Sequence, residues 1–272
     1  MKRRSWPLLG VLIFGYAFLY VPILLLILYS FNESRLVTVW SGFSFKWYGE
    51  LLHNRQLLDA AWLSVRIAAV NATVAVILGT LAANALTRHG RFRGRTGFEL
   101  LLTAPLVMPD VIIGLSLLLL FVAMQQTIGW PNGRGFTTIA IAHITFSMAY
   151  VTVVVRSRLA RMDASLEEAA MDLGARPLTV YLRITLPLIA PALLSGWLLA
   201  FTLSLDDLVI ASFVSGPGST TLPMVVYSSV RMGVSPQINA LATLIVAIVA
   251  LAVIIAGWSM RQKPDRAQKR GA

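Results

Sequence analysis

The sequence contains no cysteine, and only 13% of its 272 residues are charged. Without cysteine the chain has no disulfides, thiolate metal ligands, iron–sulfur clusters or cysteine nucleophiles. Charged residues make up about a quarter of an ordinary soluble domain, whereas 57% of this chain is hydrophobic. We therefore expect lipid, rather than water, to surround most of it.

Acidic residues are also scarce: 12 Asp and Glu stand against 23 Lys and Arg, for a formal net charge of +11. A basic excess can attract nucleic acid, but in membrane proteins it collects in the cytoplasmic loops. Here the basic residues lie between apolar runs, so we interpret the charge as a topology signal and expect no nucleic-acid partner. No GxxxxGK[ST] loop is present, so any ATP must be hydrolysed by a separate subunit.

Long apolar runs dominate the rest of the chain, and each is long enough to cross a bilayer, which takes about 20 residues. The runs without Asp, Glu, Lys or Arg are 7–32, 67–87, 111–133, 135–155, 184–205, 208–230 and 232–260. The run 208–230 is a poor helix candidate because it contains Gly216-Pro217-Gly218 and Pro223.

The positive-inside rule decides the number of spans. With six spans, the basic residues 2–4, 88–95, 156–183 and 261–270 all lie inside, whereas a seventh span would place the basic tail outside. We therefore predict that 208–236 is an outer loop that dips back into the protein, where its backbone is shielded from lipid.

The predicted fold is a single-domain, all-α integral membrane protein with six transmembrane helices and both termini cytoplasmic. The first span is expected to be uncleaved, because its apolar run is too long for a signal peptide and no small-residue cleavage site follows. Pro105 and Pro109 should kink or break the third span, and Ala75, Gly79 and Ala83 should allow close helix contact in the second. The predicted spans are 8–31, 60–87, 98–125, 136–156, 188–208 and 237–260.

The inner loop 157–187, between the fourth and fifth spans, has the signals of two short helices. Asp163 or Ser165 can cap the first helix, and Gly174 can end it in the left-handed conformation. Pro177 suits the first turn of the second helix. The sequence therefore predicts a helix, a tight turn and a second helix on the inner face.

This loop carries a motif: Glu168-Ala169-Ala170, three residues, Gly174, nine residues, and Ile184-Thr185-Leu186-Pro187. It resembles the EAA loop of the permeases of binding-protein-dependent ABC importers. The resemblance implies that the short helix sits in a groove of the nucleotide-binding subunit and transmits ATP-driven closure to the spans. A purely interfacial amphipathic hairpin is the alternative. The candidate coupling residues are Glu167, Glu168, Ala169, Ala170, Asp172, Gly174 and Pro187.

Three further segments resemble the polyamine branch of that family, and above all the putrescine permeases. They are Leu36-Val37-Thr38-Val39-Trp40-Ser41-Gly42, Ala104-Pro105-Leu106-Val107-Met108-Pro109-Asp110, and Leu203-Ser204-Leu205-Asp206-Asp207-Leu208-Val209-Ile210-Ala211-Ser212-Phe213. The resemblance implies a non-enzymatic, multi-pass permease of the bacterial inner membrane with no cofactor or metal. Its expected partners are a second, homologous permease, two ATP-binding cassette subunits and a periplasmic polyamine-binding protein.

Acidic residues inside spans are the candidate substrate contacts, because each is costly unless it is paired or faces water. Asp110 lies about 18 Å into the third span and Asp206 near the outer end of the fifth. Ser195, Thr202 and Asp206 return to nearly the same helix face, which suggests one wall of a wet path. The candidate pathway residues are Asp110, Asp206, Asp207, Ser195, Thr202, Trp197 and Phe201, with Phe121 or Tyr150 as further apolar surface.

Two alternatives stay open for these residues. The acids could sit in outer-face water, or pair with Arg66 or Arg231 to lock helices; His143 is expected to be an ordinary packed or hydrogen-bonded residue. For the whole chain, the alternatives to putrescine import are a permease for spermidine or another small solute, and an ion-gradient-driven secondary transporter. Dependence of uptake on ATP hydrolysis separates the ABC permease from the secondary transporter.

Overall fold

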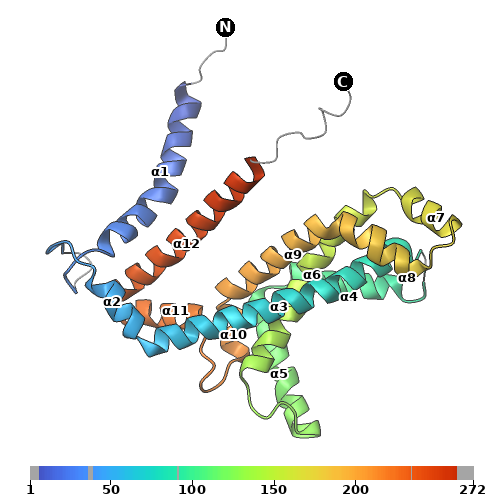
Figure 1. Ribbon diagram of the computed structural model, residues 1–272. Helices are drawn as coiled ribbons and strands as arrows, with labels where there is room; N and C mark the ends of the chain where they lie inside the picture. The colour runs from blue at the N-terminus through green and yellow to red at the C-terminus, as the bar shows by residue number, and fades with distance from the viewer. Residues whose placement is uncertain (1–5, 36–38, 91, 234, 262–272) are drawn as a thin grey trace. The chain divides into compact units, whose positions relative to one another are not determined.

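A computed structural model of the chain describes residues 6–35, 39–90, 92–233 and 235–261. Within those ranges the regular elements are all helices (Figure 1), apart from one isolated bridge between Asn32 and Phe43. Some predicted features lie outside the described residues: the basic residues 2–4, Arg91 and the tail 262–272, and the motif residues 36–38.

Within the part of the chain that the structure describes, five helical segments are long and apolar enough to cross a membrane. A shorter apolar segment, Pro236–Leu251, lies in α12 (Pro236–Arg261). These lengths and compositions confirm the predicted all-helical membrane class. The five segments lie in α1 (Trp6–Tyr29), α3 (Arg55–Arg88), α5 (Asp110–Ile128), α6 (Phe136–Ala160) and the continuous helical stretch Pro177–Asp206.

The described chain divides into two compact units, and the first contains residues 1–58 and 226–272. Within it, α12 contacts both α1 and α2 (Lys46–His53). The amide of Gln237 at the start of α12 donates to Glu50 at 2.9 Å, and its oxygen accepts from Asn54 at 3.1 Å. These polar contacts fix the start of α12 against α2.

The second unit, residues 59–225, is built around close packing of α3, α6 and α9 (Leu186–Asp206). Val151 of α6 lies between Gly79 of α3 and Gly196 of α9. A Cβ added to Gly79 would lie 2.8 Å from Cγ1 of Val151, so only glycine fits there. Ala75 and Ala83 are fully buried on the same helix, which confirms the predicted close contact of the small-residue stripe.

A buried amide joins the same three helices. The side-chain nitrogen of Asn71 on α3 donates to the Ser147 hydroxyl at 3.1 Å and to the Ala200 carbonyl at 2.8 Å. Because α6 carries Ser147 and α9 carries Ala200, one side chain fixes the depth of all three helices relative to one another. Buried polar groups of this kind specify a unique packing when they are hydrogen-bonded.

The third predicted span is broken where the two prolines indicated. The helix α4 (Arg95–Val107) includes Pro105, and Met108 and Pro109 are extended before α5 begins. A residue that precedes proline is pushed towards extended geometry, and Met108 has φ −77° and ψ 137°. The predicted break is therefore confirmed.

The segment 208–236 requires a correction, because most of it is helical rather than loop. It contains α10 (Val209–Val214) and α11 (Leu222–Met232), joined by a non-helical stretch that includes Gly216-Pro217-Gly218. The sequence prediction missed α10 because hydrogen bonds to the side chain of Asp207, which precedes the helix, stabilise its first turn. Its buried apolar side chains pack against α5 and α6, so its backbone is shielded by protein.

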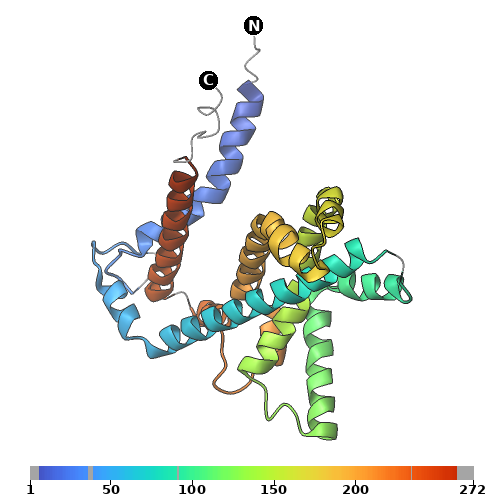
Figure 2. The ribbon, with the colours of Figure 1, turned by 45° about the vertical axis from the view of Figure 1, so that its right-hand side comes forward.

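The predicted hairpin and the acidic pair Asp206-Asp207 lie at opposite ends of α9 (Figures 1 and 2). On one side of α9 the chain forms α7 (Ser165–Asp172), α8 (Pro177–Val180) and a π-helical turn, η1 (Tyr181–Thr185). On the other side α9 ends at Asp206, and two residues separate it from the start of α10. One helix therefore connects both candidate sites.

Candidate functional site

The hairpin α7–α8 has the first helix and the tight turn that its sequence predicts, but the second helix, α8, continues through η1 into α9 instead of ending as a separate short helix. The Asp163 carboxylate accepts the backbone N–H of Ser165 at 3.0 Å, and hydrogen bonds from Ser165 lower the pKa of Asp163. Gly174 follows α7 with φ +86°, in the left-handed region where a Cβ is disfavoured. Pro177 is the first residue of α8, a position where a missing N–H costs little, and Pro187 is the second residue of α9, directly after η1.

Glu167 fixes this hairpin to the membrane helices. Its carboxylate lies 3.0 Å from Nε of Arg88, the last residue of α3. It also accepts the hydroxyl of Thr185 at 2.7 Å, in the last residue of η1 before α9 begins. The Arg88 and Glu167 side chains are only 21% and 15% exposed, so water screens this ion pair weakly. Glu167 therefore joins α7 to the end of α3 and to the turn that precedes α9.

The opposite face of the hairpin is open. No residue of α7 is buried, and Glu168, Ala169 and Asp172 are exposed while Ala170 is half-buried. Apolar side chains accompany them, of which Leu173 is the most exposed at 90%. An exposed apolar surface with acidic neighbours is typical of a protein-binding surface. The apolar members are Leu166, Met171, Leu173 and Leu178.

The two acids that close α9 have different surroundings. Asp206, the last helical residue, is exposed. Asp207 is half-buried, and its Oδ2 lies 3.1 Å from Nε2 of His143 and accepts the N–H of Ala211 at 2.7 Å. Its Oδ1 accepts the N–H of Ile210 at 3.3 Å. The helix-locking alternative thus holds for Asp207, but with His143 as the partner instead of Arg66 or Arg231.

The predicted polar stripe on α9 is an exposed face. Ser195, Thr202 and Asp206 are all exposed, whereas Gly196, Ala200 and Ser204 on the other face are buried. Both hydroxyls of the stripe donate to their own helix, from Ser195 to the carbonyl of Pro191 and from Thr202 to that of Leu198.

Aromatic surface lies on the same helix as the stripe. Trp197 and Phe201 stack with ring centroids 5.1 Å apart, and the Trp197 indole donates to Thr73 of α3 at 3.2 Å. Phe121 is buried against Trp130, and Tyr150 packs on Phe146. The stacked pair on α9 is therefore the aromatic surface that adjoins the polar stripe.

Asp110 occupies the first turn of α5, directly after the break in the third predicted span. Its side chain is exposed, and it makes no ion pair with any residue that the structure describes. A carboxylate is favourable there because the first turn of a helix carries a partial positive charge. Asp110 is therefore free to meet a cation.

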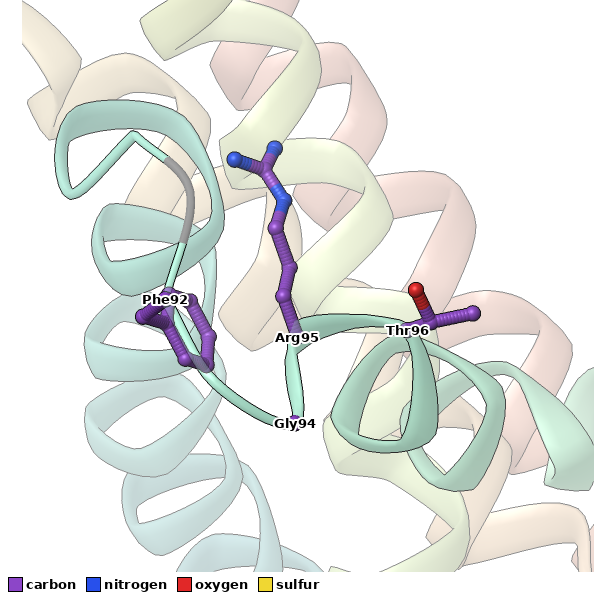
Figure 3. Close-up of a pocket in the computed structure, with 4 residues that line it drawn as sticks. All are labelled: Phe92, Gly94, Arg95 and Thr96. Carbon is purple, nitrogen blue, oxygen red and sulfur yellow. The ribbon is translucent and has the colours of Figure 1, made fainter.

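An open hollow of about 650 Å³ lies beside the connection between α3 and α4 and is lined by Phe92, Gly94, Arg95 and Thr96. Figure 3 shows Arg95 rising from the start of α4, between Phe92 and Thr96. Its guanidinium donates to the carbonyls of Leu86 and Gly90 and so satisfies the end of α3. The role that these contacts give Arg95 is to cap the end of α3.

Sequence reasoning missed three partners in these sites: Arg88, Thr185 and, as a partner of Asp207, His143. Thr185 lies inside the loop motif, and Arg88 is the first basic residue after the second predicted span. Both positions were noticeable in the sequence, but their spacing did not show that they contact Glu167. Among the described residues, no three His, Asp or Glu side chains gather closely enough to hold a metal ion.

Comparison with known proteins gives a consistent set of relatives. Residues 75–264 match the family described as binding-protein-dependent transport system inner membrane component. The chain is 62% identical over 268 residues to the putrescine transport system permease protein PotI of Escherichia coli K12, which covers 98% of this chain and 95% of PotI. It is 44% identical over 248 residues to the spermidine/putrescine transport system permease protein PotC of the same organism, which covers 91% of both chains.

Solved structures share the fold at lower identity. A crystal structure of a bacterial ABC transporter involved in the import of the acidic polysaccharide alginate aligns with a TM-score of 0.70 at 18% identity. The alignment covers 97% of this chain and 99% of that one.

Proposed function

Since this chain belongs to the family of binding-protein-dependent transport system inner membrane components, we propose that it carries putrescine inward as half of an ATP-driven translocation pathway. The chain is a permease subunit of the inner membrane and not an enzyme. The observation that carries the substrate assignment is the 62% identity to PotI over 98% of the chain. The lower identity of 44% to PotC makes spermidine the second candidate substrate.

The proposed topology has six spans with both termini in the cytoplasm, in one transmembrane domain. Its spans are those predicted from the sequence, with the third interrupted at Pro109 and the sixth within α12. The hairpin α7–α8 then lies on the cytoplasmic side, and α10 and α11 lie towards the periplasm. The support is the distribution of basic residues, which favours the cytoplasmic side for the hairpin.

The proposed partners are a second, homologous permease, two ATP-binding cassette subunits and a periplasmic polyamine-binding protein. We assign the ATPase contact to the exposed face of α7, which presents Glu168, Ala169 and Asp172 beside apolar side chains. Force crosses between subunits only through a rigid, closely packed contact. Here the Glu167 carboxylate supplies the rigidity, because it ties the hairpin to α3 and to the start of α9.

The proposed pathway lies along the exposed face of α9 and past the break before α5. Asp206 and Asp110, which form no ion pair with the residues that the structure describes, offer their carboxylates to the two ammonium groups of a diamine. Trp197 and Phe201 offer aromatic surface to the methylene chain of the diamine. The ring faces also attract its ammonium groups. Ser195 and Thr202 add polar groups to this exposed face of α9. Asp207 adjoins this face, but its carboxylate is bonded to His143 and to the start of α10.

Uptake by the reconstituted importer tests the substrate. Proteoliposomes that contain the permease pair and the ATPase, with the binding protein outside, should accumulate labelled putrescine only when ATP is inside. An excess of unlabelled spermidine should compete weakly. Uptake driven by an ion gradient without ATP would identify a secondary transporter, and preferred uptake of spermidine would identify the second candidate.

Cysteine labelling tests the topology on a clean background, because the chain has no cysteine of its own. Cysteines at Arg95 and Ala272 should be protected from an impermeant thiol reagent in intact cells, whereas one at Asn132 should react. Reaction at Ala272 with protection at Asn132 would reverse the orientation.

A further inference from the structure

We propose that His143 is a positioning residue for transport: it holds Asp207 at the corner between α9 and α10, so that of these two neighbouring acids only Asp206 faces the substrate. This inference rests on the proposed pathway and assigns a role to a side chain that the pathway does not include. It follows from contacts among α6, α9 and α10, all within the second compact unit.

His143 is buried, with 2% exposure, and both of its ring nitrogens have partners across a helix interface. A carboxylate only accepts hydrogen bonds, so Nε2 carries a proton and donates to Oδ2 of Asp207 at 3.1 Å. In the neutral ring, Nδ1 accepts the hydroxyl of Ser204, which lies 2.7 Å away. The carboxylate thus fixes the tautomer, and Ser204, whose hydroxyl can donate or accept, holds the ring orientation through the other nitrogen.

The Asp207 carboxylate therefore receives three donors: the His143 ring and the backbone N–H groups of Ile210 and Ala211. The two backbone groups belong to the first turn of α10, where donors have no partner within the helix. Turning Asp207 towards a substrate would leave all three donors without an acceptor in a buried place, which is costly. Asp207 is thus fixed as part of the protein.

Fixing Asp207 also fixes its neighbour. Asp206 is the last residue of α9, and Asp207 leaves the helix with extended geometry, φ −66° and ψ 124°. With Asp207 turned inward to α6, Asp206 keeps its place on the exposed face with Ser195 and Thr202. Loss of the His143 contact frees the corner, and the Asp206 carboxylate then loses its defined position on that face.

A matched pair of substitutions tests this role. The amide nitrogen of Gln reaches the place of the His Nε2 atom, whereas that of Asn reaches only the place of Nδ1. His143→Gln therefore keeps the bond to Asp207, and His143→Asn loses it, although both replacements are neutral amides. The measurement is the ratio of putrescine transported to ATP hydrolysed in reconstituted complexes, expressed per assembled complex, because a purely structural defect reduces assembly without changing this ratio.

We expect His143→Gln to stay within about two-fold of the parental ratio and His143→Asn to fall at least five-fold below it. Equal ratios in the two variants would overturn the inference. If His143→Asn does not assemble, Ser204→Ala decides, because it releases only the ring orientation: a ratio lowered by more than about two-fold supports the inference, and a ratio within about two-fold of the parental value overturns it. Asp206→Asn separates the two proposals, since parental uptake in that variant defeats the pathway itself. Defective Asp206→Asn beside normal His143→Asn defeats only the role of His143.

Discussion

Two acidic doublets, each a pair of adjacent acidic residues, lie at the two ends of α9. In each doublet one carboxylate is tied, meaning that it is bonded to other helices, and its neighbour is free, meaning that it is exposed. In the doublet near the start of α9, Glu167 is tied by Arg88 and Thr185, and Glu168 is exposed. In the doublet at its end, Asp207 is tied by His143 and the first turn of α10, and Asp206 is exposed.

The order of tied and free residues is reversed between the doublets, so neither place in the doublet determines the role. The role depends on the direction of the local backbone, because the carboxylate that is turned towards a basic side chain on another helix becomes the tied one. A tied carboxylate transmits position, and the exposed neighbour is left to meet a partner. The comparison predicts that tied and free acids respond differently to substitution, in the order of stability effects that follows.

The largest loss of stability is expected for Asp207→Ala. This change leaves His143 and two backbone N–H groups without their acceptor, and we expect the free energy of unfolding to fall by about 3 kcal/mol. The thermal unfolding midpoint of the purified complex in detergent measures it, with Asp206→Ala as the matched control. Equal midpoints for the two variants would remove the distinction at this end of α9.

Glu167→Ala should have the next largest effect, about 2 kcal/mol, because a charged hydrogen-bonded contact is lost and Arg88 stays half-buried without its partner. Uptake should fall at least ten-fold in complexes that still contain the ATPase. The exchange Arg88→Glu with Glu167→Arg restores the charge pair and should recover part of this loss. No recovery, with Glu167→Ala transporting normally, would show that the tie does not couple the hairpin to α3.

A smaller effect, about 1 kcal/mol, is expected for Gly174→Ala, which places a Cβ at φ +86° beside the helix that presents Glu168. Nothing lies within 4 Å of that Cβ, so the cost is conformational strain alone. Gly97→Ala is the matched control, since Gly97 lies within α4, has the same free space and has no left-handed backbone. If both alanines shift the unfolding midpoint equally, the left-handed turn is not what Gly174 provides.

The free acids should barely change stability. We expect Glu168→Gln and Asp206→Asn each to change the free energy of unfolding by less than about 0.5 kcal/mol, as exposed substitutions usually do. Their effects should separate by function: Glu168→Gln weakens co-purification of the ATPase, and Asp206→Asn lowers putrescine uptake with the ATPase still bound. A loss of ATPase binding in Asp206→Asn would contradict this division.

Local signals in the sequence were sufficient for much of the fold. Pro109 marked the break in the third predicted span, Gly174 and Pro177 marked the ends of the hairpin helices, and the stripe at Gly79 marked a close contact. These features depend on the conformational limits of single residues, so they can be recognised without any tertiary partner.

The pairing of the acids could not be recognised in that way. Glu167 lies 79 residues from Arg88, and Asp207 lies 64 residues from His143, so no local pattern connects them. The sequence offered Arg66 and Arg231 as equally charged partners, but Arg66 instead lies over the ring of Phe136, 5.2 Å from its centroid. The helix α10 was missed for the same reason, because the residue that caps it is itself held from α6.

The π-helical turn η1 sets the rotational phase between the hairpin and α9. At its end the N–H of Leu186 donates to the carbonyl of Tyr181, five residues back, instead of four as in an α-helix. A π-turn accommodates one residue more than an α-turn, and each residue of an α-helix advances the chain by about 100°. If all five residues of Tyr181–Thr185 took α geometry instead, everything before them would turn by about that angle relative to α9. Glu167 would then point away from Thr185. The wide turn, which absorbs one residue, therefore keeps the hairpin in register with α9.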